Sequence, residues 1–394
     1  MRKTMTFILT VLAASALLLT GCNPILPSGG KSVKFTANSK SQPATKTTYA
    51  GNAASTGSTH EDIYWSPNDA IRIYSGDPSV VRPVIQTENG VCADYKLVVP
   101  NATSTRASLE NEASNGLEWL DDPTGTAVTF YAVYPRSTRG SESGWFTMSI
   151  PSEQKFATPT GTNMEHAYML AQNTLTRSQF NTAVSLDFYP AFTAFQINLT
   201  SKDDELTLMK FRIYSEDNHL AGDYYGKLIA VNGQSEKDKY FAFNNGQTLR
   251  MDFACVLDDN NQPTSLQNEV SVEFPFVEDA STGARTYTEK ISRNKAVDFT
   301  LLALPYGIVN PLADYSSQPY LTNLWLEVTY LRNGVREQKR LALKQTTNGV
   351  ESFIEFSACK KYRLNALAVG DSWKIFFGVS VDDWKELDPT TIVF

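Results

Sequence analysis

Short runs of alternating apolar and polar residues recur along most of this sequence, and they constrain the fold more than any other feature. Alternation with a period of two places every second side chain on the same face of an extended strand. Gly, Asn, Asp and Pro, which favour turns, separate the runs. The clearest runs are 70–74, 95–99, 126–134, 145–150, 184–199 with a break at Tyr189-Pro190, 206–214, 240–243, 270–276, 296–304, 324–330, 340–344, 362–368 and 375–381. Only residues 108–120 and 164–171 show a weak helical period. The pattern therefore predicts an all-β protein built from antiparallel β-sandwiches.

The chain is long enough for two such domains. It has 394 residues, and 373 remain if a leader of 21 residues is removed, which is more than one ordinary domain needs. Hydrophobic residues make up 42% of the chain, so sizeable cores can form. Residues 172–181 are rich in Thr, Gln and Asn and lack a core pattern. We therefore predict a first domain at 32–178 and a second domain at 179–394.

Charge and histidine content argue against two classes of function. The formal charge is −7, and it becomes −9 when Arg2 and Lys3 leave with the leader, which argues against nucleic acid as a partner. The three histidines, His60, His166 and His219, lie far apart in the sequence, and the acidic doublets lack the ligand spacing of a calcium loop. No nucleophile, base and orienting group assemble in any motif. We therefore predict no metal, no cofactor and no enzymatic activity.

The N-terminus has the features of a bacterial lipoprotein leader. Arg2 and Lys3 precede an apolar run at 7–19, which is shorter than the roughly 20 residues that a membrane-spanning helix needs. The run ends in Leu19-Thr20-Gly21-Cys22, which resembles a lipobox. We predict a signal peptide at 1–21 and a lipid on Cys22 that attaches the precursor to the outer membrane. The alternative is a plain signal peptide followed by a chance cysteine.

Three short regions follow Cys22 before the first long strand run. Residues 22–31 contain Pro and Gly and are predicted to be a tether. Residues 32–37 alternate like a short strand. Residues 38–60 are rich in Ser, Thr, Ala and Gly without periodicity, which is typical of a loop.

Three further cysteines, Cys92, Cys255 and Cys359, cannot all pair with one another. No C-x-x-C motif is present, so we favour thiols that act as small apolar residues. Export would still permit a Cys255–Cys359 bridge.

A series of motifs, in order along residues 19–384, resembles the fimbrillin family, the lipoprotein-derived pilins of Bacteroidales. The motifs are the lipobox, Val33-Lys34-Phe35, Ala44-Thr45-Lys46-Thr47, Trp65-x-x-x-Asp69-x-Ile71-x-Ile73-Tyr74, Phe130-Tyr131-Ala132-Val133-Tyr134-Pro135, Ile150-Pro151-Ser152-Glu153-Gln154, Tyr168-Met169-Leu170-Ala171, Val184-Ser185-Leu186-Asp187-Phe188, Leu220-Ala221-Gly222-Asp223-Tyr224, Leu304-Pro305 and Val379-Ser380-Val381-Asp382-Asp383-Trp384. One departure is Tyr189-Pro190, where the family often has a histidine two residues after the Leu-x-Phe strand. The resemblance implies two transthyretin-like β-sandwich domains in tandem.

The resemblance also implies a fimbrial subunit or accessory pilin that serves adhesion. Such a protein is exported as a lipoprotein, and a trypsin-like protease then removes the lipid together with the first strand, here about 32–46. A strand of another pilin subunit fills the groove, so that a head-to-tail polymer of one or several kinds of subunit forms a cell-surface fimbrium. Val33 and Phe35 lie on the strand that would be removed, and their side chains would face the core of the domain. The expected cleavage is between Lys46 and Thr47, with Lys40 as the fallback, because no Arg lies between Cys22 and Arg72.

The C-terminal residues Ile392, Val393 and Phe394 are apolar and β-prone, and they follow Pro389, which interrupts sheet hydrogen bonding. They are predicted to be either a donor segment for the next subunit or the final strand of their own domain.

A different function is also consistent with the sequence. The chain could remain anchored through Cys22 as a surface glycan-binding protein or adhesin that contacts host or bacterial ligands. Aromatic residues such as Tyr131 could then stack on sugars. For Phe130, Tyr131 and Tyr134 we favour positions on the faces of a sheet, and for Trp65 and Asp69 a packed indole and a turn carboxylate.

Overall fold

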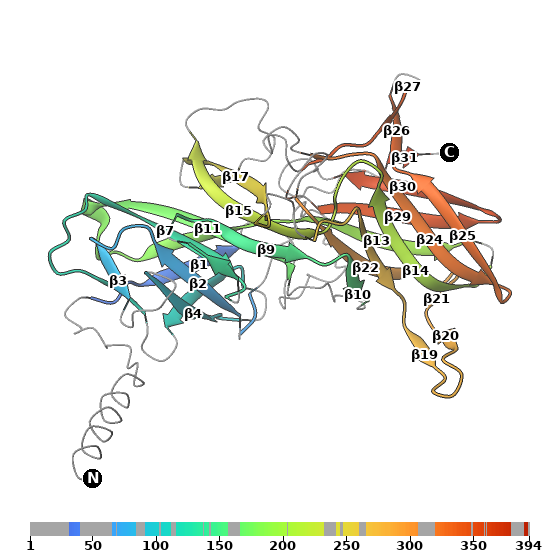
Figure 1. Ribbon diagram of the computed structural model, residues 1–394, viewed down its shortest axis with the longest axis horizontal. Helices are drawn as coiled ribbons and strands as arrows, with labels where there is room; N and C mark the ends of the chain where they lie inside the picture. The colour runs from blue at the N-terminus through green and yellow to red at the C-terminus, as the bar shows by residue number, and fades with distance from the viewer. Residues whose placement is uncertain are drawn as a thin grey trace, which may run out of the picture.

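The chain folds into two groups of β-strands along its long axis (Figure 1). The computed structural model describes residues 31–39, 65–67, 69–83, 91–101, 104–111, 116–136, 138–141, 143–156, 166–202, 204–231, 242–244, 247–259, 265–305, 320–347, 350–357, 359, 361–379 and 390–392. Within these ranges no residue is α-helical, and the 3₁₀ turn η3 (Arg177–Gln179) is the one helical element that lies entirely inside them. The predicted all-β fold class is confirmed.

Seven strands of the first group close into a barrel. Their order around the barrel is β1 (Phe35–Ser39), β12 (Val184–Pro190), β11 (Met169–Thr176), β7 (Ala127–Tyr134), β2 (Ala70–Ser75), β4 (Cys92–Val98) and β5 (Arg106–Asn111), and β5 returns to β1. Large buried side chains, including Trp65, Phe130 and Phe188, belong to the core that these strands enclose. Two short strands, β3 (Val81–Pro83) and β6 (Leu117–Trp119), pair with each other outside this ring.

The second group contains two sheets that pack face to face. One sheet has the order β10 (Glu153–Lys155), β18 (Glu269–Glu273), β14 (Leu206–Ser215), β24 (Leu324–Arg332) and β25 (Val335–Ala342), with β21 (Lys290–Ile291) beside β14. The other has the order β22 (Val297–Ala303), β13 (Thr193–Ser201), β29 (Lys361–Val369), β30 (Ser372–Val379) and β31 (Thr390–Ile392). The rings of Phe211 on β14 and Phe299 on β22 meet edge to face at 5.1 Å, so the apolar faces of the two sheets share one core.

Three hairpins or pairs of short strands extend this second group. They are β19 (Phe276–Glu278) with β20 (Arg285–Tyr287), β26 (Lys344–Thr347) with β27 (Val350–Phe353), and β23 (Tyr320–Leu321) with β28 (Phe356–Ser357).

A further sheet joins the two groups. Its order is β16 (Ala242–Asn244), β17 (Gln247–Cys255), β15 (Gly222–Val231), β9 (Phe146–Ile150) and β8 (Arg139–Gly140). Phe146 on β9 packs against Tyr74 of the barrel at 5.7 Å between ring centroids, and a Cβ on Gly226 of β15 would lie 2.4 Å from the Met148 side chain. Side chains on the outer face of the barrel therefore belong to the same core as the second group.

The strand pairing differs from the predicted antiparallel sandwiches. β1 runs parallel to β12, β13 runs parallel to β29, and β10 runs parallel to β18. The first group is a closed barrel rather than two facing sheets. Alternation of residues reports which side chains share a face, but it does not identify the neighbouring strand or its direction.

The weak helical patterns at 108–120 and 164–171 were wrong. These ranges contain parts of the strands β5, β6 and β11. In β11, Leu170 belongs to the core outside the barrel, whereas Met169, Ala171 and Leu175 belong to the core inside it. A strand that is buried on both faces loses its alternation, so its sequence no longer shows a period of two.

The strand pairing does not divide the barrel from the second group at the predicted boundary, 178/179. β12 follows that boundary, yet it pairs with β1 and β11 in the barrel. β13 is the next strand, and it pairs with β22 and β29 of the second group. After β10, which belongs to the second group, the chain returns to the barrel in β11 and β12, and it passes to the second group again between Pro190 and Thr193.

Cys92, Cys255 and Cys359 are all in the thiol form, and no disulfide joins them. Cys92 and Cys255 are buried in the larger core, as predicted for small apolar residues, and Cys359 is half-buried beside it. The alternative Cys255–Cys359 bridge is not formed.

Candidate functional site

The barrel is completed by β1, which is the first strand of the described chain. β1 pairs in parallel with β12, from Phe35 beside Val184 to Ser39 beside Phe188. On its other side it pairs antiparallel with β5, where Ala37 lies beside Ala107. We call the space between β12 and β5 that β1 occupies the slot. A strand is thus present where residues 32–37 were predicted to form one, but it begins at Phe35 and ends at Ser39.

The inward face of β1 is apolar and well packed. Val33 and Phe35 are each 2% exposed, and Ala37 is fully buried. The Phe35 ring makes edge-to-face contacts with Tyr95 at 5.1 Å and with Phe130 at 5.2 Å. The slot therefore accepts a large ring at position 35 and only a small side chain at position 37.

The outward face of β1 carries a polar contact that sequence reasoning missed. The amide nitrogen of Asn38, Nδ2, donates to Ser185 Oγ and to Asp187 Oδ1, both at 2.8 Å. Asp187 is 4% exposed, although it belongs to the outward side of β12. A carboxylate inside the strand sequence Val184-Ser185-Leu186-Asp187-Phe188 is a signal that Asp187 needs a polar partner, because charged residues are rarely buried unless they are paired, but it does not identify Asn38 as that partner.

The segment before β1 is bound by a further strand. Val33 N donates to Leu117 O, and Trp119 N donates to Lys31 O. These bonds tie residues 31–33 to β6, and Ser39 N donates to Thr105 O at the other end of β1. The described segment 31–39 therefore has two parts. The residues of β1 fill the slot, and residues 31–33 precede it alongside β6.

Three of the predicted site residues lie within the described ranges, and the others lie outside them. Val33 and Phe35 lie in the barrel core, as predicted for a first strand. Ile392 lies in β31, whose backbone pairs antiparallel with β30, with Ile392 beside Ile375. The remaining predicted residues lie outside the described ranges: Cys22, Lys40, Lys46, Thr47, Val393 and Phe394. The structure does not bring the two ends of the chain together in a described contact.

Trp65 and Asp69 have the packing roles that we favoured from the sequence. Trp65 is fully buried and meets Tyr134 and Phe188 edge to face. Asp69 is also buried, and its carboxylate accepts hydrogen bonds from Ser66 N at 2.9 Å and from the Tyr134 hydroxyl at 2.9 Å. These residues fix the turn that leads into β2.

The aromatic motif at 130–134 has mostly core residues. Phe130 and Tyr134 are buried inside the barrel. Tyr131 is on the outer side, where Lys227 Nζ lies 5.8 Å from its ring centroid and 5.9 Å from that of Trp145. The sheet-face interpretation is therefore confirmed for Phe130 and Tyr134, and Tyr131 is half-buried at the junction with β15.

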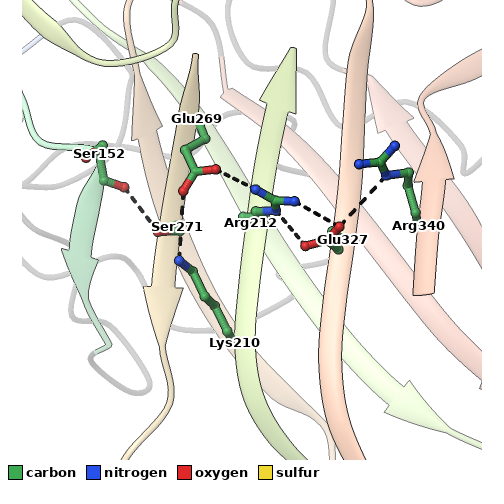
Figure 2. A network of polar contacts seen from close by, with 7 residues as sticks. All are labelled: Ser152, Lys210, Arg212, Glu269, Ser271, Glu327 and Arg340. Carbon is green, nitrogen blue, oxygen red and sulfur yellow. Dashed lines mark hydrogen bonds and ion pairs between the residues drawn. The ribbon is translucent and has the colours of Figure 1, made fainter. Parts of the chain in front are cut away.

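A ladder of charged residues crosses one face of the second group (Figure 2). Arg212 on β14 binds Glu327 on β24 through Nε at 2.6 Å and Nη2 at 3.0 Å, and it binds Glu269 on β18 through Nη1 at 2.7 Å. Arg340 on β25 lies 3.8 Å from Glu327, and Lys210 lies 3.8 Å from Glu269. The ladder thus links four neighbouring strands.

These ion pairs shift the pKa values of Arg212 and Glu327. Hydrogen bonding to Glu327, more than any other cause, raises the pKa of the Arg212 guanidinium. Burial alone would raise the pKa of Glu327, but hydrogen bonds from Arg212 and Gln338 and the nearby charges of Arg212 and Arg340 hold it below its usual value. Since each carboxylate is met by arginine, the ladder is best explained as a cross-strand brace rather than a binding site.

Two further features are absent from the described ranges. No group of three or more His, Cys, Asp or Glu side chains in these ranges could hold a metal ion. Within the same ranges, no helix has the length and apolar character needed to cross a lipid bilayer.

Comparison with known proteins gives matches among solved structures. No protein-family model and no curated protein matches the chain. A structure assigned as a cell adhesion protein from Bacteroides uniformis is 12% identical, with 91% of this chain and 100% of that chain covered and a TM-score of 0.47. A fimbrial protein from Bacteroides vulgatus is 11% identical, with 89% and 99% covered and a TM-score of 0.36. A fimbrial assembly protein from Parabacteroides distasonis is 8% identical, with 92% and 99% covered and a TM-score of 0.35.

Proposed function

We propose that the chain is a fimbrial subunit or accessory pilin that assembles at the cell surface by exchange of its first strand and serves adhesion. The observation that carries this proposal is the position of β1, a single short strand close to the N-terminus that completes the barrel between β12 and β5. Under the same proposal, the transthyretin-like sandwich description applies to the second group, whose two sheets pack face to face, and the first group keeps its closed barrel.

Removal of β1 would leave a groove that another chain can fill. The facing edges of β12 and β5 would each lose a row of backbone hydrogen bonds. The pockets of Val33 and Phe35 would open, and each buried apolar side chain of this size contributes about 1.5–3 kcal/mol. A strand from another subunit restores both kinds of contact, and head-to-tail repetition of this exchange makes a filament.

The C-terminal strand is placed where it could be donated. β31 lies at the end of its sheet and pairs with β30 alone among the described strands. Its release would therefore leave the pairs between β22, β13, β29 and β30 in place. In this scheme Ile392, Val393 and Phe394 enter the groove of the next subunit.

The proposal also includes the processing steps before assembly. The precursor reaches the outer membrane with a lipid on Cys22, and a trypsin-like protease cleaves between Lys46 and Thr47, or after Lys40. Both lysines lie between Ser39, the end of β1, and Trp65, which is fixed in the barrel core. Cleavage at either lysine would separate β1 from the barrel without cutting another barrel strand.

Substitution of both lysines tests the processing step. We expect cells that produce the Lys40→Gln/Lys46→Gln variant to lose the high-molecular-mass ladder and surface fibres that wild-type cells give, because β1 stays in the slot. The readouts are gel electrophoresis without boiling and electron microscopy of whole cells. Lys96→Gln, an exposed lysine on β4, is the matched control and should assemble normally. Normal fibres from the double variant would contradict removal of β1 at these sites.

The donor half of the scheme is tested by deleting Asp388–Phe394. The truncated chain should fold as a monomer, because β31 is the last strand of its sheet. It should nevertheless fail to join subunits whose β1 has been removed. Unfolding or aggregation of the truncated chain would show that β31 belongs to its own core, and normal polymerisation would show that donation comes from elsewhere.

A further inference from the structure

The alternation of apolar residues on β1 does not by itself fix its register in the slot. A shift by one residue would turn the apolar face outward, but a shift by two residues would keep every side chain on its present face. A shift that moved Phe35 to position 37 would meet the small pocket there, but the opposite shift would place Phe35 in the pocket of Val33, which also accepts an apolar side chain. A contact on the outward face would distinguish the native register from this shifted one.

Asn38 makes that contact. In the native register it lies beside Asp187, and its Nδ2 group uses both of its hydrogens, one on Ser185 Oγ and one on Asp187 Oδ1, at 2.8 Å each. Because an ionised carboxylate only accepts hydrogen bonds, the amide nitrogen rather than the amide oxygen must face Asp187. A shift by two residues would remove the amide from both acceptors.

Few side chains can replace Asn38 at this position. A hydroxyl group donates one hydrogen, so it satisfies one acceptor at a time, and an apolar side chain donates none. A carboxylate would face Asp187, which is 4% exposed, with a like charge. A cation would lie between Asp187 and Arg106, its cross-strand neighbour on β5. The short primary amide fits best.

We infer that the slot selects an incoming strand that carries asparagine at the position of Asn38, one residue after a small side chain and three after an aromatic one. This inference rests on the proposed strand exchange. It also specifies the partner, because residues 366–394, which include β30 and β31, contain neither Asn nor Gln. Residues 366–394 of a second copy therefore do not meet this requirement, and we assign the occupant of the slot to a strand of a different protein.

Peptide competition tests the inference on a nicked chain. A specific protease site introduced after Lys46 in the chain that starts at residue 23 allows β1 to be cut from the barrel while it stays bound. A labelled peptide of residues 31–40 then replaces it and reports occupancy. The competitors are the unlabelled native peptide, its Asn38→Leu variant, its Thr36→Leu variant and a peptide of residues 385–394. Thr36 is the matched control because it lies on the same outward face but is exposed.

We expect the Asn38→Leu peptide to compete at least about tenfold less well than the native peptide, which corresponds to the loss of hydrogen bonds to a buried charged group. The Thr36→Leu peptide should compete within about twofold of the native one. The peptide of residues 385–394 should compete no better than Asn38→Leu. In a Ser185→Ala chain, the ratio between the native and Asn38→Leu peptides should shrink, which a general loss of stability would not cause.

Three results would overturn the inference, and they differ in whether they also contradict the proposed strand exchange. Equal competition by the native and Asn38→Leu peptides would show that the amide does not select the strand, while strand exchange itself would stand. Native-like competition by residues 385–394 would make a second copy the occupant. Failure of the native peptide to exchange would contradict the proposed function as well, because no strand could then enter the slot.

Discussion

Replacement of Phe35 by alanine is expected to lower the free energy of unfolding of the barrel by about 3–5 kcal/mol. The ring is 2% exposed and lies between Tyr95 and Phe130, so its removal leaves a cavity that these two aromatic side chains border. Tyr95 cannot easily move into the cavity, because its hydroxyl accepts a hydrogen bond from Leu117 N at 2.8 Å. Denaturant unfolding followed by tryptophan fluorescence measures the loss, since Trp65 and Trp119 belong to the same core.

Thr36→Ala is the control for this measurement. Thr36 is the next residue on β1 but is exposed, so its replacement should change the stability by no more than about 0.5 kcal/mol. If Phe35→Ala is as mild as Thr36→Ala, β1 contributes little to the barrel, and its replacement by another strand would supply little energy for assembly.

The Glu327→Gln substitution is expected to lower stability by about 1–3 kcal/mol at neutral pH. Glu327 has an 8% exposed side chain and meets two guanidinium groups, those of Arg212 and Arg340. Glutamine keeps the shape but removes the charge that pairs with both. Glu205→Gln is the control, because the Glu205–Lys290 pair is largely exposed, and such pairs contribute about 0–1 kcal/mol.

The effect of Glu327→Gln should depend on pH in a defined direction. The pKa of Glu327 lies below its usual value in the folded state, so the unfolded state takes up the proton more readily. The stabilisation is therefore fully present above the ordinary glutamate pKa of about 4.3 and is lost as the pH falls through the lower folded value. Stability curves of the wild type and Glu327→Gln should converge between about pH 5 and pH 3. Parallel curves would show that the ladder does not depend on this charge.

The sequence predicted most strands that are buried on one face only. The run at 184–199, broken at Tyr189-Pro190, corresponds to β12 and β13, and the run at 206–214 corresponds to β14. In most of β13 and β14 the apolar residues alternate because one face meets a core and the other is less buried. In β12, Val184, Leu186 and Phe188 alternate because they line the barrel core, although its other face is also largely buried. The proline at the break marks the point where the chain leaves the barrel.

The sequence failed where a strand is buried on both faces or pairs with a distant partner. β11 lies between two cores and was assigned to a boundary region, since its residues Gln172, Asn173 and Thr174 gave no apolar alternation. The pairing of β9 with β15 joins Phe146–Ile150 to Gly222–Gly226 across the predicted boundary. Such long-range pairing depends on which edges meet in space, which local patterns do not encode.

The candidate site was predicted in part. Val33 and Phe35 could be assigned to a core from their alternation with Lys34 and Thr36. The Asn38–Asp187 contact could not, because it links residues 149 positions apart on parallel strands, and either residue alone is typical of a turn. Its role in the slot follows only from the closed barrel.

The most direct test of strand exchange is the N-terminal sequence of the subunit in its assembled form on the cell surface. Material from a high-molecular-mass ladder should be reduced to single subunits by boiling and sequenced from its first residue. We expect the sequence to begin at Thr47, or at Ser41 if cleavage follows Lys40, so that all of β1 is absent. An assembled subunit that begins with an acylated Cys22 and retains residues 31–39 would contradict the exchange of β1.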